Sequence, residues 1–333
     1  MNILSPILNT FSQPIDQYSG VEPTTRAFLE KLAEEDSKPI EELAPEEARK
    51  VLVDLQKSVD VDVGYLEVEQ REVQAENHFI SLTIVRPPDI AVHPPVIMFF
   101  HGGGWVLGDF QTHQRLVHDL CVASNCAVVF VDYTRSPEAA YPTAVIECYL
   151  ATKWVTENGD QIGVDGSRLT VAGNSAGGNI ATVVCMMAKE KNTPLIRHQT
   201  LFWPVTDARS NTESYQHFET GYFLTRNMMK WFWDSYLENE ESRRDIYASP
   251  INASIEQLSD LPPALIQTAE FDVLRDEGEA YAHLLIDAGV EVTSTRYLGA
   301  IHDFGLLNPL ASTPQAKAAI LQAANEIRKY VSL

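Results

Sequence analysis

Hydrophobic residues change their spacing near residue 60. Before that point they recur at helical spacing, as in EEARKVLVDLQKSVD, and Pro23 and Pro45 stand where helices are expected to begin. The following segments ISLTIVRP and PVIMFF are short and rich in β-branched or aromatic residues, which is typical of strands. The pattern predicts a helical N-terminal part over residues 1–60 and a sheet-containing part over 61–333.

Strands and helices then alternate along the chain. The predicted strands read CAVVFVDY, RLTVAG, ALIQTAEF and EVTSTRYL. The predicted helices read PTAVIECYLATKWVTEN, AGGNIATVVCMMAKEK, GEAYAHLLIDAG and PQAKAAILQAANEIRKY. This alternation predicts an α/β fold with a mostly parallel sheet covered by helices, and ligands on such sheets bind beyond the carboxyl ends of the strands. Residues 205 to about 250 show no strand pattern and are predicted to be an inserted helical element.

Composition and charge exclude several classes of function. Hydrophobic residues make up 45% of the chain, which is enough for a large core. The 46 acidic residues outnumber the 25 basic ones and give a net charge of −21, which disfavours nucleic acid and anionic membranes as partners. The four cysteines form no CxxC pair and are expected to be buried free thiols.

No segment of the sequence resembles a targeting or membrane-spanning element. The N-terminal segment MNILSPILNTFSQPIDQ has no basic region followed by a long apolar stretch, as a signal peptide would. No apolar run approaches the roughly 18 residues that a transmembrane helix needs. We therefore expect a cytoplasmic protein without membrane insertion.

A candidate nucleophile lies in the segment VAGNSAGGN. Residues 173–177 fit the pattern G-x-S-x-G, with a predicted strand before Ser175 and a predicted helix after it. A sharp strand-to-helix turn of this kind needs small neighbours and leaves the serine hydroxyl exposed to substrate. An ordinary glycine-rich turn is the alternative, whereas a phosphate-binding loop lacks its lysine.

A second glycine-rich segment, FFHGGGW, follows the strand PVIMFF. Three consecutive glycines cost conformational entropy unless the backbone itself is used, and loops of this HGGG type supply N–H donors to an oxyanion hole. His101 precedes the glycines and is expected to order the loop rather than to act as a base. A flexible turn is the alternative for this segment taken alone.

An acid and a histidine follow the nucleophile along the chain. Asp272 stands directly after the predicted strand ALIQTAEF, whereas Glu270 lies within that strand and Asp276 begins the next helix. His302 follows the next predicted strand, while His283 lies in a helical pattern. The order Ser, Asp, His matches that of the α/β-hydrolases.

Together these stretches resemble the hormone-sensitive-lipase-like family of α/β-hydrolases, the esterases marked by HGGGW. The resemblance runs from about residue 80 to the C-terminus and includes VDYTRSPEAAYPTAVIE, FWPVTD and YASPIN. Two departures stand out. Position 174 is Asn where the family commonly has GDSAG or GTSAG, and the acid is followed by Val273 where DPL is common. The effect of Asn174 on subfamily and substrate stays open.

The resemblance implies a catalytic triad of Ser175, His302 and Asp272. It also implies oxyanion-hole N–H groups from Gly103, Gly104 and Ala176, a helical cap formed by residues 1–60 and 205–250, and no metal or other cofactor. The implied function is a serine carboxylesterase that hydrolyses small neutral short-chain acyl esters. An amidase, carbamate hydrolase or peptidase using the same triad is an alternative, and a non-catalytic small-molecule receptor is another.

Aromatic residues are the candidates for the substrate pocket. Those expected to bind substrate are Trp105, Tyr222, Phe223 and Trp231, with Trp233 as a further candidate. The alternative is that these aromatics only pack the cap helices. The resemblance also allows a homodimer through the last strand and the C-terminal helix.

Overall fold

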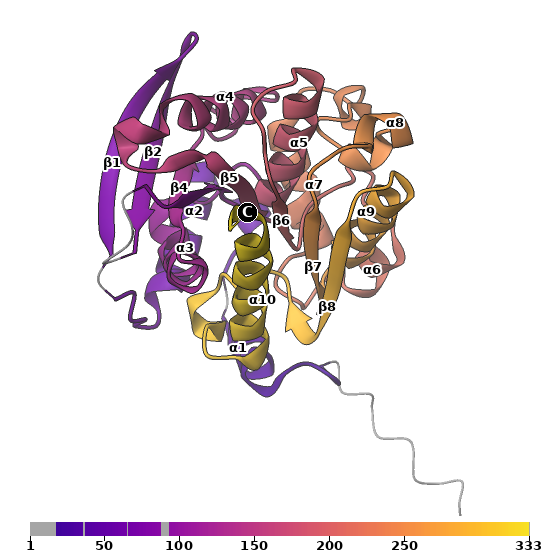
Figure 1. The fold of residues 1–333 in the computed structure, drawn as a ribbon. Helices are drawn as coiled ribbons and strands as arrows, with labels where there is room; N and C mark the ends of the chain where they lie inside the picture. The colour runs from indigo at the N-terminus through magenta and orange to yellow at the C-terminus, as the bar shows by residue number, and fades with distance from the viewer. Residues whose placement is uncertain (1–17, 36, 65, 88–92, 333) are drawn as a thin grey trace, which may run out of the picture.

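The computed structural model describes residues 18–35, 37–64, 66–87 and 93–332. Within these residues a single eight-stranded sheet carries helices on both faces, in the order β1-β2-β4-β3-β5-β6-β7-β8 (Figure 1). The strands are β1 (Glu67–Ala75), β2 (His78–Arg86), β3 (Pro95–Phe100), β4 (Ala127–Asp132), β5 (Asp165–Asn174), β6 (Gln199–Phe202), β7 (Ala264–Phe271) and β8 (Val292–Ile301). The α/β fold predicted from the alternating pattern is confirmed.

The sheet is parallel from β4 through β8, while β2 pairs antiparallel with both β1 and β4. The mostly parallel arrangement agrees with the sequence-based prediction. Two strands were not predicted. β1 is an edge strand with mostly exposed, charged residues, and β6 has only four residues, so neither gives a clear hydrophobic period.

Helices cover the sheet in two layers. The longer ones are α3 (Phe110–Ser124), α4 (Thr143–Asn158), α5 (Ala176–Glu190), α9 (Arg275–Asp287) and α10 (Pro314–Val331). Helices α3 and α10 pack together on one face, and α4, α5 and α9 lie on the other (Figure 1). Strand β3 joins the two cores, because Val96 and Met98 point into one and Ile97 and Phe99 into the other.

The N-terminal part is helical as predicted. Helix α1 (Pro23–Glu34) and helix α2 (Pro45–Lys57) each begin at the expected proline, with the short turn η1 (Ile40–Glu42) between them. Residues 1–17 of the predicted helical part lie outside the described residues.

The predicted insert between β6 and β7 is also helical. It contains α6 (Glu213–His217), α7 (Arg226–Tyr236), η3 (Ser242–Arg244) and η4 (Pro250–Asn252). Helix α7 packs against η1 from the N-terminal part. The remaining short elements are η2 (Gly159–Ile162), α8 (Ile255–Leu258) and η5 (Asn308–Leu310).

The register of the parallel strands places the ends of β5, β7 and β8 at the same edge of the sheet. Phe271 at the end of β7 is the partner of Ile301 at the end of β8. Asn174 at the end of β5 is the partner of Phe202 at the end of β6. Because parallel strands end at one edge of the sheet, the residues that follow β5, β7 and β8 emerge on the same side of the molecule.

Two observations complete the fold. All four cysteines are free and buried, as expected from their apolar surroundings. Among the described residues, no helix is both long enough and apolar enough to cross a membrane.

Candidate active site

Ser175 occupies a strained turn between β5 and α5. Its backbone has φ 54° and ψ −119°, a conformation that L-residues rarely adopt. The flanking glycines are required by packing, because a Cβ on Gly173 would overlap the Gly177 carbonyl and one on Gly177 would overlap the carbonyl of Phe100. The turn therefore has the geometry that the G-x-S-x-G pattern predicts.

His302 connects Ser175 to Asp272. Its Nε2 lies 3.0 Å from Ser175 Oγ, and its Nδ1 lies 2.7 Å from Asp272 Oδ2. The side chains come from the ends of β5, β7 and β8, and all three residues are at least 96% buried, with exposed fractions of 4% for Ser175, 2% for His302 and 1% for Asp272. The structure thus brings together the three residues that the sequence suggested as a triad.

The two rival acids have other partners. Glu270 accepts a hydrogen bond from the Gly299 N–H at 2.7 Å, which joins the ends of β7 and β8. Asp276 accepts from the Ser214 N–H at 2.7 Å and pairs with Arg275. Asp272 is held by the Leu274 N–H, which donates to its Oδ1 at 3.0 Å and leaves Oδ2 for His302.

The surroundings of His302 favour its protonated form. Burial lowers the pKa of the imidazole, but the negative charges of Asp272 and Asp303 raise it more, so the pKa lies above its ordinary value. Asp303 Oδ2 lies 3.8 Å from His302 Nε2, on the side of the ring that faces Ser175. An imidazolium formed at His302 is therefore stabilised by two carboxylates.

The glycine loop between β3 and α3 packs on Asn174, the residue directly before Ser175. Gly103 and Gly104 have φ of +101° and +58°, which favours glycine, and the Gly103 carbonyl accepts from the Val106 and Leu107 N–H groups. Within the described part of the chain, the N–H groups of Gly103 and Gly104 donate to no backbone carbonyl. Ala176 is the first residue of α5, where the N–H has no acceptor within the helix.

His101 orders this loop, as expected from its position. Its ring stacks on Tyr133 with centroids 4.1 Å apart, and the Tyr133 hydroxyl donates to the His101 carbonyl at 2.9 Å. Burial and the charge of neighbouring His113 hold the pKa of His101 well below its usual value. His101 therefore packs beside the loop, in surroundings that disfavour its imidazolium form.

The sequence did not predict the two side chains that contact the backbone of the glycine loop. The Gly102 N–H is 3.0 Å from Asn174 Oδ1 and 3.3 Å from His113 Nε2. The Asn174 amide in turn donates to Asp303 at 3.0 Å. Asn174 was visible as a departure from the family motif, whereas His113 lies in α3, a helix that was not predicted from the sequence.

The candidate pocket aromatics lie in two places: Trp105 packs on α7, whereas Tyr222 and Phe223 lie near the end of β7 and near α1. Trp105 is fully buried and stacks on Tyr236 of α7 with ring centroids 4.2 Å apart. Tyr222 stacks on Phe271 at 5.5 Å, and Phe223 lies 6.0 Å from Phe28 of α1.

The insert residue that packs on the glycine loop is one that the sequence did not single out. A Cβ on Gly104 would overlap the ring of Phe232, so this ring lies directly on the loop backbone. Trp231, the candidate from the sequence, is half-buried beside Phe232 with ring centroids 5.2 Å apart. Phe232 is 3% exposed and is therefore the better placed of the two to limit space at the loop.

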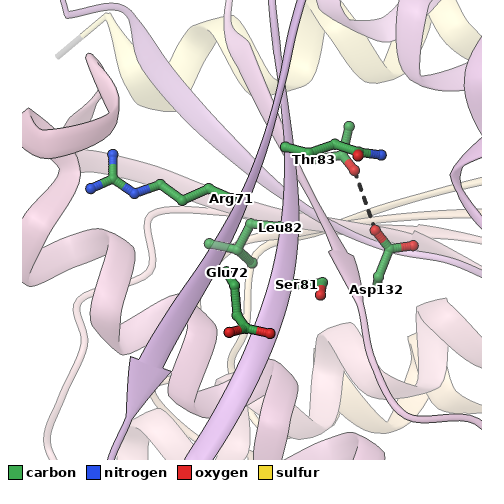
Figure 2. Close-up of a pocket in the computed structure, with 7 residues that line it drawn as sticks. Arg71, Glu72, Ser81, Leu82, Thr83 and Asp132 are labelled. Atoms are coloured by element: carbon green, nitrogen blue, oxygen red, sulfur yellow. Dashed lines mark hydrogen bonds between the residues drawn. The ribbon is translucent and has the colours of Figure 1, made fainter.

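A separate surface hollow of about 370 Å³ lies over β1, β2 and the end of β4. Figure 2 shows the hydrogen bond that Thr83 donates to Asp132 there, with Arg71 and Glu72 among the other lining residues. Burial raises the pKa of Asp132 to about 6. The lining contains Ser81 but no histidine, so this hollow offers that serine no imidazole base.

No group of three or more His, Cys, Asp or Glu side chains among the described residues is arranged to hold a metal ion.

Comparisons with known proteins agree with the geometry. A family model described as the alpha/beta hydrolase fold matches residues 97–306. Carboxylesterase NlhH of Mycobacterium tuberculosis is 33% identical over 331 residues, covering 96% of this chain and 95% of that protein. Ethyl acetate hydrolase of Pseudomonas putida is 34% identical over 232 residues, covering 69% of this chain and 72% of that protein.

A solved structure gives the same result. The crystal structure of a thermostable esterase from Pseudomonas putida ECU1011 matches with a TM-score of 0.93 and 58% identity, covering 94% of this chain and 98% of that one. The resemblance drawn from the motifs is therefore confirmed, and this chain belongs to the hormone-sensitive-lipase-like family of α/β-hydrolases.

Proposed function

We propose that this ester hydrolase is a serine carboxylesterase that cleaves short-chain acyl esters through an acyl-enzyme intermediate. The observation that carries the proposal is the chain of contacts from Asp272 Oδ2 to His302 Nδ1, at 2.7 Å, and from His302 Nε2 to Ser175 Oγ, at 3.0 Å. These are the separations that general-base activation of a hydroxyl requires.

The first half of the reaction forms the acyl-enzyme. His302 Nε2 accepts the proton as Ser175 Oγ attacks the ester carbonyl carbon, and Asp272 holds the Nδ1–H tautomer and stabilises the imidazolium. His302 then gives the proton to the leaving alkoxide, and the alcohol departs. In the second half, water attacks the acyl carbon with His302 again as base, and the acid is released from Ser175.

The oxyanion of each tetrahedral intermediate needs preorganised donors. We assign this role to the N–H groups of Gly103, Gly104 and Ala176. Their support is the positive φ of both glycines, the absence of carbonyl acceptors for Gly103 and Gly104 among the described residues, and the helix N-terminus at Ala176. Losing one such donor typically costs about 10²–10³ in kcat.

A cap built from residues 1–60 and 205–250 is part of the proposal. Its support is the packing of α7 on η1 and the contact of the Phe232 ring with Gly104. Rings this close to the loop favour short acyl groups, with Trp105, Tyr222, Phe223 and Trp231 as the candidate substrate-binding residues. The name of the relative ethyl acetate hydrolase also supports a short acyl chain.

The test is a set of initial rates on p-nitrophenyl esters from acetyl to palmitoyl, with Ser175→Ala measured alongside. We expect a maximum at short chains and a loss of at least roughly 10³-fold in the variant. A maximum at long chains would overturn the short-chain assignment, and a fully active Ser175→Ala would overturn the nucleophile. Parallel rates on p-nitroanilides separate an esterase from an amidase.

The receptor alternative makes the opposite prediction for covalent labelling. A non-catalytic receptor has no need for a base on Ser175, whereas here His302 contacts both Ser175 and Asp272. We expect an organophosphonate to label Ser175 stoichiometrically and His302→Ala to abolish the labelling. Unlabelled wild-type protein would favour the receptor.

A homodimer through β8 and α10 remains a proposal. Strand β8 is the last strand of the sheet, and Leu298 on it and Leu321 on α10 are exposed by 66% and 57%. Light scattering of the wild-type protein tests it, and a monomeric mass at all concentrations would contradict it.

A further inference from the structure

Asn174 joins the two loops that flank the nucleophile. It is the last residue of β5 and is fully buried. Its Oδ1 accepts from the Gly102 N–H at 3.0 Å, and its Nδ2 donates to Asp303 Oδ1 at 3.0 Å. Gly102 directly precedes the two glycines of the oxyanion loop, and Asp303 directly follows His302. One side chain therefore ties the oxyanion donors to the catalytic base.

The orientation of the amide follows from its partners. The Gly102 N–H is only a donor, so it needs the amide oxygen, and the Asp303 carboxylate is an acceptor, so it needs the amide nitrogen. Asp303 Oδ1 also accepts from the Trp203 indole N–H at 2.6 Å. Both partners specify one orientation, and a flipped amide would lose both contacts.

The backbone of Gly102 and the side chain of Asn174 are packed in close contact. A Cβ on Gly102 would lie 2.5 Å from Asn174 Nδ2, so the loop backbone rests directly on the amide. His113 Nε2 lies near the same Gly102 N–H, at 3.3 Å. A change in the Asn174 side chain therefore acts on the loop without an intervening residue.

The chemistry at position 174 must match Asp303. An aspartate there has the same shape as Asn174 and keeps the acceptor for Gly102. Its second oxygen, however, would face Asp303 Oδ1 at the 3.0 Å now occupied by a hydrogen bond. Two buried carboxylates at that distance repel each other unless they share a proton. The aspartate that is common at this position in the family motif would therefore place two carboxylates against each other in this chain.

We propose that Asn174 is a positioning residue that holds the oxyanion loop and the His302 loop together, and that it is an amide because its partner is Asp303. The proposal rests on the proposed esterase function. Its consequence is kinetic: misplacing the loop or the base affects the transition state more than substrate binding, so kcat changes and KM does not.

A double-mutant cycle over positions 174 and 303 tests the proposal. We expect Asn174→Asp to lower kcat about 10²-fold with little change in KM. Asp303→Asn alone costs a few-fold, because the new amide oxygen can still accept from Asn174 and Trp203. In the Asp303→Asn background, Asn174→Asp is expected to cost about tenfold or less, because the repulsion between two charges is gone.

Asn179→Asp is the matched control. Asn179 is equally buried, and its Nδ2 donates to the carbonyls of Val205 and Ala248, away from residue 303. Its effect should be the same in both backgrounds. If Asn174→Asp also has the same effect in both, the proposed pairing is overturned.

Two further measurements keep the test decisive. If Asn174→Asp fails to fold while the double variant folds, that rescue supports the pairing. If neither folds, Asn174→Thr removes the bridge without adding a charge, and wild-type kcat in that variant overturns the positioning role.

A failure of the proposed function is distinguishable from a failure of this inference. In the first case the wild type is inactive on esters, yet the thermal stabilities of the four cycle members still show the coupling. In the second case the wild type is active and the effects on kcat and stability are additive.

Discussion

The two sides of the candidate site are built by different physical means. The polar side consists of Gly102, His113, Asn174 and Asp303, where hydrogen bonds of 3.0 to 3.3 Å connect one group to the next. The aromatic side consists of Trp105, Phe232, Trp233 and Tyr236, where rings pack at centroid distances such as 4.2 and 4.6 Å.

The difference lies in how each side satisfies its polar atoms. On the aromatic side, the indole N–H groups of Trp105 and Trp233 and the Tyr236 hydroxyl have no hydrogen-bond partner among the described residues. Directional bonds fix the polar side to one geometry, which transition-state stabilisation requires. Ring packing is less directional, so the aromatic side is the one where substrate preference can change without loss of the chemistry.

The largest expected effect comes from replacing the acid of the proposed triad. Asp272→Asn should lower kcat by roughly 10⁴-fold, because the amide no longer selects the productive His302 tautomer. The control is Glu270→Gln, which alters the neighbouring rival acid whose contact is the Gly299 N–H. Steady-state rates on a short ester check both, and a greater loss in Glu270→Gln would assign the acid role to Glu270.

A smaller effect is expected on the aromatic side. Phe232→Leu should make room above Gly104 and raise the kcat/KM ratio of octanoyl to acetyl ester by roughly tenfold, the lower end of the discrimination that one methylene provides in an apolar pocket. Trp231→Leu is the control on the same helix turn. If Trp231→Leu shifts the ratio and Phe232→Leu does not, Trp231, as expected from the sequence, limits the acyl pocket and Phe232 does not.

The pH dependence of catalysis tests whether Asp303 acts on His302 through its charge. In the proposed mechanism His302 acts as a base only when neutral. We therefore expect kcat/KM to rise with pH through the pKa of His302, which the charges of Asp272 and Asp303 raise. Asp303→Asn removes one of these charges and should lower that pKa, moving the acid limb of the profile to lower pH. Two further ionisable groups lie nearby and are unchanged in this variant: Asp272, which contacts His302, and His113, which contacts Gly102.

The control for this profile is Asp160→Asn, which removes a charge whose side chain is 87% exposed. Solvent and salt screen a charge at such a position, so the acid limb should not move. An unchanged limb in Asp303→Asn as well would show that Asp303 acts on His302 only through geometry.

The smallest expected effect compares two buried tyrosines. Tyr236→Phe removes a hydroxyl that has no partner among the described residues, so the free energy of unfolding should change by less than about 0.5 kcal/mol. Tyr281→Phe removes a hydroxyl bonded to Thr182 Oγ1 at 2.7 Å and should cost about 1–2 kcal/mol, because the threonine hydroxyl is left unpaired. Urea unfolding of both variants checks this, and equal losses would reveal a partner for Tyr236.

Much of the fold was predictable because its signals are local. The alternation of strands and helices, the helix starts at Pro23 and Pro45, and the glycines around Ser175 all follow from short-range rules of spacing and steric fit. Strands β1 and β6 were missed because an exposed edge strand and a four-residue strand carry too little hydrophobic pattern.

The sequence by itself determined the order of Ser175, Asp272 and His302 and the preference for Asp272, because each follows a recognisable strand. Only the tertiary structure decided that Asn174 pairs with Asp303, 129 residues away, and that Phe232 rather than Trp231 packs on Gly104. The physical reason is that strand ends are set by local periodicity, whereas partners across loops depend on register and packing. The hydrophobic pattern along the chain contains no information about register between strands or packing across loops.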